Sequence, residues 1–294
     1  MVRKKETVLF IVNPVSGTSD KKNLPERIEK SLDKGRFIPL ILYSDHPGHA
    51  HSIAKDHVEQ GVRKIIAVGG DGTVNEVASA VMNSSSILGI VPLGSGNGLA
   101  RHLRIPMNID KAVALINRDR IIMVDYGLIN QTPFFCTAGV GFDALIGNKF
   151  ATMEGRGFSN YVKTSIQEYF RYEPQFYTLR DNGHSMEKEA FLITIANASQ
   201  YGNNAYIAPE ADVSDGLLDV TVISPFPKFL SPSFGLMLFN RKLGRSKYVE
   251  MFRTRQLTLE RKVPDFVHFD GEPSTMGEKL TFKVKHMGLN VLIP

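Results

Sequence analysis

Hydrophobic and polar positions follow two different rhythms along the chain. Up to about residue 120, short apolar runs such as TVLFIVNP, RFIPLILYS and KIIAVGG alternate with stretches that carry an apolar residue at every third or fourth position. The apolar runs are typical of buried strands, and the other stretches are typical of amphipathic helices. Strands that alternate with helices in this way predict βαβ units and a parallel sheet.

Beyond about residue 120 the pattern changes to strand-like runs separated by turn residues, among them PFFCTAGVGF and LLDVTVIS. In this part only residues 158–172 and 230–248 have a helical pattern. We therefore expect an α/β domain over residues 1–125 and a mainly-β sandwich domain over residues 126–287. The apolar residues 288–294 predict a strand that returns to one of the sheets and can complete the first domain.

Composition is typical of a soluble globular protein, because 43% of the 294 residues are hydrophobic and 22% are charged. The net charge of +5 favours anionic partners. We expect no nucleic acid among them, since the chain has no block of five basic residues and no nucleic-acid motif. Cys136 is the single cysteine, and neither a signal-peptide pattern nor a membrane-spanning apolar run is seen. These features predict a cytoplasmic protein.

Three glycine-rich turns follow predicted strands: NPVSG at residues 13–17, VGGDGT at 68–73 and PLGSGNGLA at 92–100. Parallel sheets bind ligands at the carboxyl ends of their strands, where glycine lets backbone N–H groups approach a ligand closely. The helix predicted from about Thr73 adds unpaired N–H groups and a dipole that favour phosphate. Asp71 would repel bare phosphate, which suggests a Mg²⁺ between them. The turns therefore predict a nucleoside triphosphate site.

Some of these motifs also allow other interpretations. Thr73 and Glu76 also match a capping box, in which both side chains serve only the helix. No P-loop is present. GVGFDA at residues 139–144 matches a Rossmann fingerprint but lies far from the first turn after a strand. His49 and His51 are two residues apart and face different ways on a helix, which disfavours a metal site there.

In this order, NPVSG, VGGDGTVNEV and PLGSGNGLA resemble the motifs of the diacylglycerol kinase catalytic family, which includes soluble bacterial lipid kinases, sphingosine kinases and ceramide kinases. The resemblance continues through GVGFDA, ADVSDGLLDV and DGEP, so it covers nearly the whole chain. It implies an N-terminal α/β domain like that of NAD kinases, a C-terminal β-sandwich, and ATP bound in the cleft between them. The activity that it implies is Mg²⁺-dependent phosphorylation of a lipid hydroxyl.

The same resemblance assigns residues to the site. Those expected to line the nucleotide are Asn13, Gly17, Ser44, Gly69, Gly70, Asp71, Gly72, Thr73, Asn75 and Ser95. A structural Mg²⁺ would be held by the Asp215 side chain and the main-chain carbonyls of Asp212 and Leu217, an all-oxygen set that suits a hard cation. Without the resemblance, Asp215 and Gly216 would be interpreted as an ordinary turn before a strand.

The resemblance makes Glu272 the general base that takes the proton from the acceptor hydroxyl. Two alternatives stay open: Asp71 is the base, as is often proposed for its counterpart in sphingosine kinases, or Glu272 is a structural carboxylate after the turn at Asp270 and Gly271. The chain also departs from many bacterial members, because Gly98 stands where they have an aspartate. The acceptor therefore stays open between diacylglycerol and a sphingoid lipid.

A lipid acceptor requires contact with a membrane surface. Residues 225–248 combine apolar side chains with the basic residues Lys228, Arg241, Lys242, Arg245 and Lys247. This stretch could rest on an anionic interface, and the alternative is a helix packed on the sandwich with its basic end in solvent. An exposed sheet edge would support a homodimer. The rival functions are an NAD-kinase-like enzyme and a nucleotide-binding regulatory protein without turnover.

Overall fold

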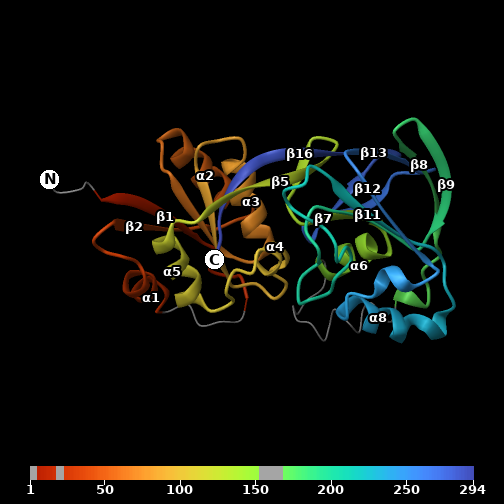
Figure 1. Ribbon diagram of the computed structural model, residues 1–294, viewed down its shortest axis with the longest axis horizontal. Coiled ribbons are helices and arrows are strands. Elements are labelled where there is room, and N and C mark those ends of the chain that lie inside the picture. Colours follow the sequence, from red (N-terminus) through yellow and green to blue (C-terminus); the bar gives the residue numbers. More distant parts are fainter. Residues whose placement is uncertain (1–4, 18–22, 152–167) are drawn as a thin grey trace. The chain divides into compact units, whose positions relative to one another are not determined.

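The computed structural model describes residues 5–17, 23–151 and 168–294. Its internal contacts divide the chain into two units, Met1–Val124 with Met287–Pro294, and Asp125–His286 (Figure 1). Two strands extend from one unit into the other along the chain, β5 (Ile121–Ile129) and β16 (Lys279–Leu292).

The first unit contains a parallel sheet (Figure 1). In spatial order its strands are β2 (Phe37–Tyr43), β1 (Glu6–Val12), β3 (Lys64–Gly69), β4 (Ile87–Pro92) and the end of β16. Strands β3 and β4 are buried along their whole length, as is usual for the centre of a parallel sheet. Asn290 and Val291 of β16 pair in parallel with Ile87 and Leu88 of β4, which confirms the predicted return of the last residues to a sheet.

The helices described in this unit are α1 (Leu24–Ser31), α2 (His49–Glu59), α3 (Asp71–Val81), α4 (Gly98–His102) and α5 (Ile109–Arg118). Helix α2 packs on α3, and α1 packs on α5 (Figure 1). The sequence of α5 shows why such a segment folds locally: Ile109, Val113 and Ile116 recur every three or four residues and are all buried. The Asn108 side chain caps the same helix by accepting the Lys111 N–H at 3.1 Å.

The second unit is an antiparallel β-sandwich. One sheet has the order β12 (Val249–Thr254), β11 (Leu218–Ile223), β10 (Leu192–Ala196), β7 (Thr137–Gly141), β14 (Asp265–Phe269) and β15 (Glu272–Met276). The other has the start of β16, β13 (Gln256–Glu260), β8 (Gln175–Asp181) and β9 (His184–Ala190); in addition β5 pairs with β16, and β6 (Thr132–Phe134) pairs with β5. Large side chains such as Phe134, Tyr177 and Phe282 fill the core of the sandwich. The expected fold class is therefore confirmed.

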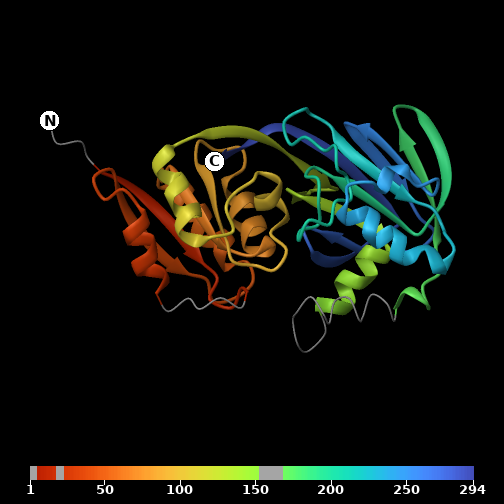
Figure 2. The ribbon, with the colours of Figure 1, turned by 60° about the horizontal axis from the view of Figure 1, so that its bottom comes forward.

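Helices α6 (Phe142–Ala151) and α8 (Ser231–Phe239) lie against these strands, and α8 is flanked by the 3₁₀ turns η1 (Lys228–Leu230) and η2 (Leu243–Arg245) (Figure 2). The helix predicted over residues 230–248 ends early because Arg241 adopts a left-handed backbone conformation, with φ of 57°. The helix predicted over residues 158–172 falls largely outside the described residues. Within the described part of the chain, no helix has the length and hydropathy needed to cross a membrane.

Candidate functional site

The three glycine-rich turns of the first unit meet at the carboxyl edge of its parallel sheet. Asn13 donates its backbone N–H to the Val68 carbonyl (3.1 Å), which joins the first turn to the second. Leu93 donates its backbone N–H to the Gly69 carbonyl (2.8 Å), which joins the third turn to the second. The Asn13 side chain also donates to the Thr73 hydroxyl (3.2 Å). The segments that were expected to converge therefore do so.

The turns touch backbone to backbone because glycines stand at the contacts. A Cβ on Gly94 would lie 2.6 Å from the Cα of Gly70, and a Cβ on Gly17 would lie 1.8 Å from the Leu93 carbonyl oxygen. Gly17 also has a φ of 63°, in the left-handed region that side chains disfavour. Only glycine fits these positions without a shift of the backbone. These glycines therefore have a packing role, and their role in a phosphate cradle stays a prediction.

Asp71, the first residue of α3, connects the second turn to the third. One carboxylate oxygen accepts the Asn97 N–H (2.8 Å) and the other accepts the Gly98 N–H (2.7 Å). These donors stand at the N-terminus of α4, where Asn97 has a left-handed backbone with φ of 53°. The Asn97 side chain closes the turn by accepting the Gly94 N–H (3.1 Å) and donating to the Gly94 carbonyl (2.7 Å). The carboxylate therefore caps a neighbouring helix.

The capping-box interpretation of Thr73 and Glu76 is wrong. Helix α3 begins at Asp71, before the predicted start, and its N-cap residue is Gly70, which has no side chain that could cap the helix. Thr73 is buried and accepts the Asn13 hydrogen bond described above. The Glu76 carboxylate instead accepts the Gly48 N–H (2.9 Å) and the His51 N–H (3.3 Å) at the start of α2. Because α2 and α3 pack on each other, this contact across helices replaces the local one.

The other nucleotide residues implied by the resemblance lie around the same edge. Ser44 follows β2, is buried and donates its backbone N–H to the Val12 carbonyl (2.9 Å). Gly72 and Asn75 belong to the first turns of α3 and are half-buried, whereas Ser95 is exposed in the third turn. The structure thus brings these residues to one edge, and their contact with a nucleotide stays a prediction.

A cavity of about 480 Å³ lies beside the third turn, within the first unit. Gly94 and Asn97 line it, together with two arginines that sequence reasoning missed, Arg27 and Arg101. Arg101 donates to the Gly96 carbonyl (2.9 Å), and Arg27 makes two 2.9 Å hydrogen bonds to the Asp110 carboxylate. The sequence gives one indication for Arg101, because this residue follows the third glycine-rich turn directly, on α4. It gives no indication for Arg27, which lies on α1, far away in the sequence.

In the second unit, Glu272 is the first residue of β15 in a two-residue hairpin. The turn residues Asp270 and Gly271 have φ angles of 49° and 85°, as a type I′ turn requires, and Asp-Gly is a preferred pair for it. The Glu272 side chain is exposed. Residues Phe269 and Glu272 face each other as the first pair of the hairpin.

Buried side chains hold both ends of this hairpin. At the turn, the buried Asp270 carboxylate accepts three backbone N–H groups, those of Phe135 (2.8 Å), Cys136 (2.7 Å) and Thr137 (3.1 Å). At the open end, Arg261 donates to the carbonyl oxygens of Asp265, Phe266, Met276 and Gly277, at 2.7 to 3.2 Å. Burial lowers the pKa of the Arg261 guanidinium below its usual range. Sequence reasoning missed both roles.

The Rossmann interpretation of GVGFDA is excluded, because β7 pairs antiparallel with both of its neighbours. Asp143 instead lies in the first turn of α6 and is part of a polar cluster. Its Oδ2 accepts hydrogen bonds from Thr194 (2.9 Å) and Tyr201 (2.8 Å) and lies 3.0 Å from His268 Nε2. These four residues come from distant parts of the chain, so no sequence pattern could have grouped them.

The implied Mg²⁺ turn lies just before β11. The Asp215 carboxylate accepts the Leu217 N–H (2.9 Å), and the Asp212 carboxylate accepts the Ser214 N–H (2.9 Å). Each aspartate thus binds the backbone two residues further on and stabilises the turn locally. The Arg253 guanidinium lies 3.9 Å from the second Asp215 oxygen. Arg253 is paired more closely with Asp219 (3.1 Å). The turn therefore has an ordinary turn geometry, and a cation held by its oxygen atoms stays a prediction.

Comparisons with known proteins agree with this architecture. The model of the diacylglycerol kinase catalytic domain matches residues 7–129, and that of the YegS C-terminal NAD kinase beta sandwich-like domain matches residues 136–293. A probable lipid kinase YegS-like from Pectobacterium atrosepticum is 30% identical over 286 residues, which cover 93% of this chain and 92% of that protein. An uncharacterized protein from Synechocystis is 32% identical over 238 residues, 76% of this chain but only 55% of that protein.

Two solved structures share the fold. A diacylglycerol kinase from Bacillus anthracis superposes with a TM-score of 0.74 at 23% identity, over 99% of this chain and 98% of that chain. An NAD kinase from Archaeoglobus fulgidus in complex with ATP superposes with a TM-score of 0.54 at 12% identity, over 97% and 92% of the two chains. The parallel α/β unit followed by an antiparallel sandwich is thus the NAD-kinase-like fold.

Within that class, the two matched domains and the relatives of 30% identity lead to one family. The chain belongs to the diacylglycerol kinase catalytic domain family, and its relatives there include proteins named probable lipid kinase YegS-like.

Proposed function

We propose that the protein is an ATP- and Mg²⁺-dependent lipid kinase that transfers the γ-phosphoryl group to a hydroxyl of a lipid such as diacylglycerol or a sphingoid lipid. The observation that carries the proposal is the edge of the first unit, where three glycine-rich turns meet backbone to backbone. Glycine turns at the start of a helix favour phosphate through backbone N–H groups. Phosphoryl transfer depends mainly on such positioning and on neutralising charge.

Magnesium would neutralise charge on the transferred phosphoryl group. Two carboxylates suit it by chemistry: Asp71 at the turn edge and Asp215 in the oxygen-rich turn before β11. Burial raises the pKa of the neighbouring Asp219, and the Arg253 guanidinium opposes that rise. Arg253 already pairs with Asp219, at 3.1 Å, and lies farther from Asp215, at 3.9 Å. A cation at Asp215 would therefore lie near a guanidinium whose charge is already paired with another carboxylate.

We assign Glu272 as the general base and Asp71 as a positioning residue. Glu272 presents an exposed carboxylate from a hairpin whose two ends are held by Asp270 and Arg261. Both oxygens of Asp71 accept backbone N–H groups of the third turn, which supports a structural task for this carboxylate. A rigid support for the reacting group is what catalysis requires of the residues around it.

For contact with the lipid, we propose that the segment at residues 225–248 docks on an anionic membrane surface. Three of its apolar side chains are unusually exposed: Phe229 (80%), Leu236 (65%) and Phe239 (46%). Helix α8 has no charged residue, and only its Phe234 is buried. The basic residues Arg241, Lys242, Arg245 and Lys247 follow directly and are exposed, while residues 225–248 contain no Asp or Glu. Apolar side chains beside unopposed cations suit an anionic interface.

The kinase proposal is tested by ADP release from Mg-ATP with a micellar panel of diacylglycerol, monoacylglycerol, sphingoid base, ceramide and phosphatidylglycerol, and with NAD as a soluble acceptor. We expect turnover with one lipid class and a loss of about 10²- to 10⁴-fold in kcat for Glu272→Gln, with ATP affinity unchanged. Glu187→Gln, an exposed glutamate on β9, is the matched control and keeps full turnover.

Two outcomes would replace the proposal. Turnover with NAD alone would favour an NAD-kinase-like enzyme, the fold of which this chain shares. ATP binding without turnover on any acceptor would favour a regulatory nucleotide-binding protein. Equal turnover in Glu272→Gln and wild type would leave Asp71 as the candidate base.

Membrane docking is tested separately by flotation with vesicles of phosphatidylglycerol and phosphatidylcholine. Serine at Arg241, Lys242, Arg245 and Lys247 is expected to remove the dependence on anionic lipid, and Phe229→Ser to weaken binding at any lipid charge. Phe176→Ser is the matched control, because Phe176 is 57% exposed on β8, outside the segment. Unchanged flotation of both segment variants would show that the segment is not the docking surface.

A further inference from the structure

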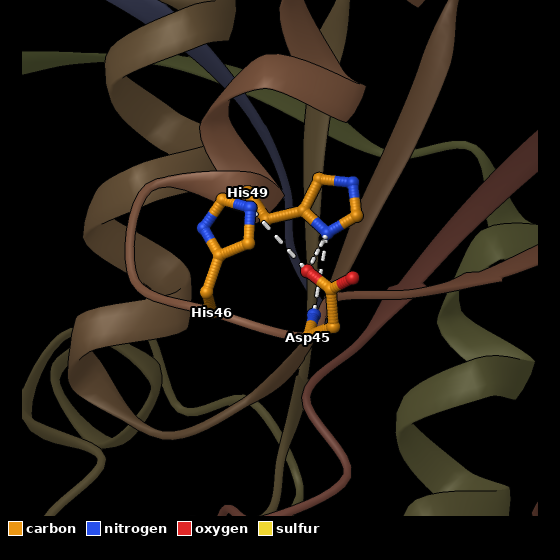
Figure 3. A group of neighbouring side chains, drawn as sticks. All are labelled: Asp45, His46 and His49. Atoms are coloured by element: carbon orange, nitrogen blue, oxygen red, sulfur yellow. Dashed lines mark hydrogen bonds and ion pairs between the residues drawn. The ribbon is translucent and has the colours of Figure 1, made fainter.

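A second candidate metal site lies in the first unit, in the loop between β2 and α2. Asp45, His46 and His49 bring one carboxylate oxygen and two imidazole nitrogens within 4.8 Å of one another (Figure 3). His49 Nδ1 lies 2.5 Å from Asp45 Oδ1, and His46 Nε2 lies 3.4 Å from the same oxygen. The two rings are stacked, with centroids 4.9 Å apart. Sequence reasoning had considered His49 with His51, but His51 turns to the Glu76 carbonyl (3.2 Å).

The tautomer of His46 follows from its second nitrogen. His46 Nδ1 lies 2.9 Å from the Pro47 carbonyl oxygen, which can only accept a hydrogen bond. The proton of the neutral ring is therefore on Nδ1, and Nε2 directs a lone pair toward Asp45. A backbone carbonyl that orients a histidine in this way is a common feature around metal ligands.

The contact of His49 with Asp45 is a hydrogen bond when no metal is bound. His49 Nδ1 lies 3.2 Å from the Asp45 backbone nitrogen and 2.5 Å from Asp45 Oδ1, and the shorter distance is that of a proton donated by the ring to the carboxylate. A divalent cation can replace that proton, because metal ligands bind in their deprotonated forms. The lone pair of His46 Nε2 then completes a donor set of two nitrogens and one oxygen.

The backbone of this loop is held on both sides. Before the ligands, the Ser44 N–H bonds to the Val12 carbonyl (2.9 Å). After them, the Gly48 N–H bonds to the Glu76 carboxylate (2.9 Å), and Gly48 takes the left-handed φ of 83° that turns the chain into α2. The side chains of Asp45, His46 and His49 are 72%, 64% and 30% exposed. They can adjust at small cost while the backbone stays in place.

We propose that Asp45, His46 and His49 bind a divalent transition-metal ion of the zinc type, with water in the remaining position. Two imidazoles and one carboxylate are a known kind of donor set for zinc, with metal–ligand distances of about 2.0 to 2.2 Å. Imidazole nitrogen favours zinc, cobalt and nickel, whereas Mg²⁺ prefers oxygen. The site is therefore separate from any Mg²⁺ of the proposed kinase reaction. Its occupation would fix the loop that follows Ser44.

The test uses the full chain purified without a histidine tag. Co²⁺ is titrated while its visible d–d absorption is recorded, and Zn²⁺ is then added as a competitor. We expect one Co²⁺ per chain in a low-coordinate environment, displaced by one equivalent of Zn²⁺. Binding is expected to weaken at least tenfold in each of Asp45→Asn, His46→Gln and His49→Gln. His184→Gln, which removes an exposed histidine from β9, is the matched control and leaves binding unchanged.

Thermal unfolding in EDTA checks that the variants fold. Asp45→Asn and His46→Gln are expected to melt with the wild type in EDTA, because both side chains are mostly exposed. Zn²⁺ should raise the melting temperature of the wild type and of His184→Gln but not of the three site variants. Co²⁺ binding that is equal in all five proteins, or no Co²⁺ absorption in the wild type, would overturn the proposal. None of these readouts requires kinase activity.

Discussion

The turn edge of the first unit and the β14–β15 hairpin of the second both contain glycine and aspartate at tight turns, but they are held in different ways. At the turn edge, Gly17, Gly70 and Gly94 let three loops touch through their backbones. In the hairpin, the Asp270 side chain accepts backbone N–H groups from outside the hairpin, among them that of Cys136. The Arg261 side chain, from just before the hairpin, donates to backbone carbonyls at its open end, among them that of Met276. At the turn edge the backbones lie so close together that an added side-chain atom does not fit, whereas the hairpin depends on the negative charge of the buried Asp270 carboxylate.

This difference predicts that the turn edge is sensitive to added volume and the hairpin to lost charge. We expect the largest loss of stability from a single substitution in the hairpin, because three backbone N–H groups share the Asp270 carboxylate as their acceptor.

The largest effect is expected for Asp270→Asn. The amide keeps one oxygen but turns an NH₂ group toward backbone N–H donors, so the free energy of unfolding should fall by about 3 kcal/mol. Asp265→Asn on the same hairpin is the control, because Asp265 is only half-buried and accepts a single backbone N–H, that of Phe266 (2.7 Å). Urea unfolding measures both. Equal losses in the two variants would contradict the anchoring role of Asp270.

The next effect is expected for Gly17→Ala, with Gly61→Ala as its control. Both glycines have a left-handed backbone, with φ of 63° and 76°, so both variants lose about 1 to 2 kcal/mol from strain alone. A Cβ at Gly61 meets nothing within 4 Å, whereas one at Gly17 meets the Leu93 carbonyl oxygen at 1.8 Å. Overpacking should therefore cost Gly17→Ala about 1 kcal/mol more, which keeps its total loss at or below that of Asp270→Asn.

Urea midpoints at an unchanged slope are the measure of this pair, and ATP binding at equilibrium is the second readout. We expect weaker ATP binding in Gly17→Ala alone. If the two variants lose the same stability, the turns do not depend on close backbone contact.

The smallest effect is expected for Asp110→Asn, which removes a carboxylate that pairs at the surface with the Arg27 guanidinium, whereas Asp270 is buried and accepts backbone N–H groups. The Arg27 guanidinium, through its hydrogen bonds, holds the pKa of Asp110 below its ordinary value of 3.8. A pKa that is lower in the folded than in the unfolded chain means that the pair stabilises the fold above pH 3.8 and that this contribution is lost as the pH falls through the folded value.

The wild type should therefore be slightly more stable than Asp110→Asn at pH 7, and the two should converge in acid. High salt should reduce the difference, since the pair is exposed. Chemical unfolding from pH 7 to pH 3 tests this, and Arg27→Gln should show the same convergence. If the difference in stability between the wild type and Asp110→Asn stayed constant from pH 7 to pH 3, the ion pair would not be its cause.

Local patterns were sufficient for most of the fold. Continuous apolar runs predicted β3 and β4, and a period of three to four residues predicted α5. These predictions succeed because the spacing of apolar residues follows from whether one or both faces of an element are buried. The start of α3 was placed too late, and the capping box was wrong, because Thr73 and Glu76 bind Asn13 and the start of α2 instead of their own helix. Contacts between helices overrode a local motif there.

By itself, the sequence determined the order of α/β and β units and the positions of the three glycine turns, since both depend on neighbours along the chain. Only the tertiary structure decided which groups meet. Asp71 caps α4, Arg261 closes the hairpin of Glu272, Asp143 joins His268, and His46 rather than His51 accompanies His49. Most of these pairs are far apart in the sequence, and a hydrogen bond depends on distance and direction in space, which no residue pattern encodes.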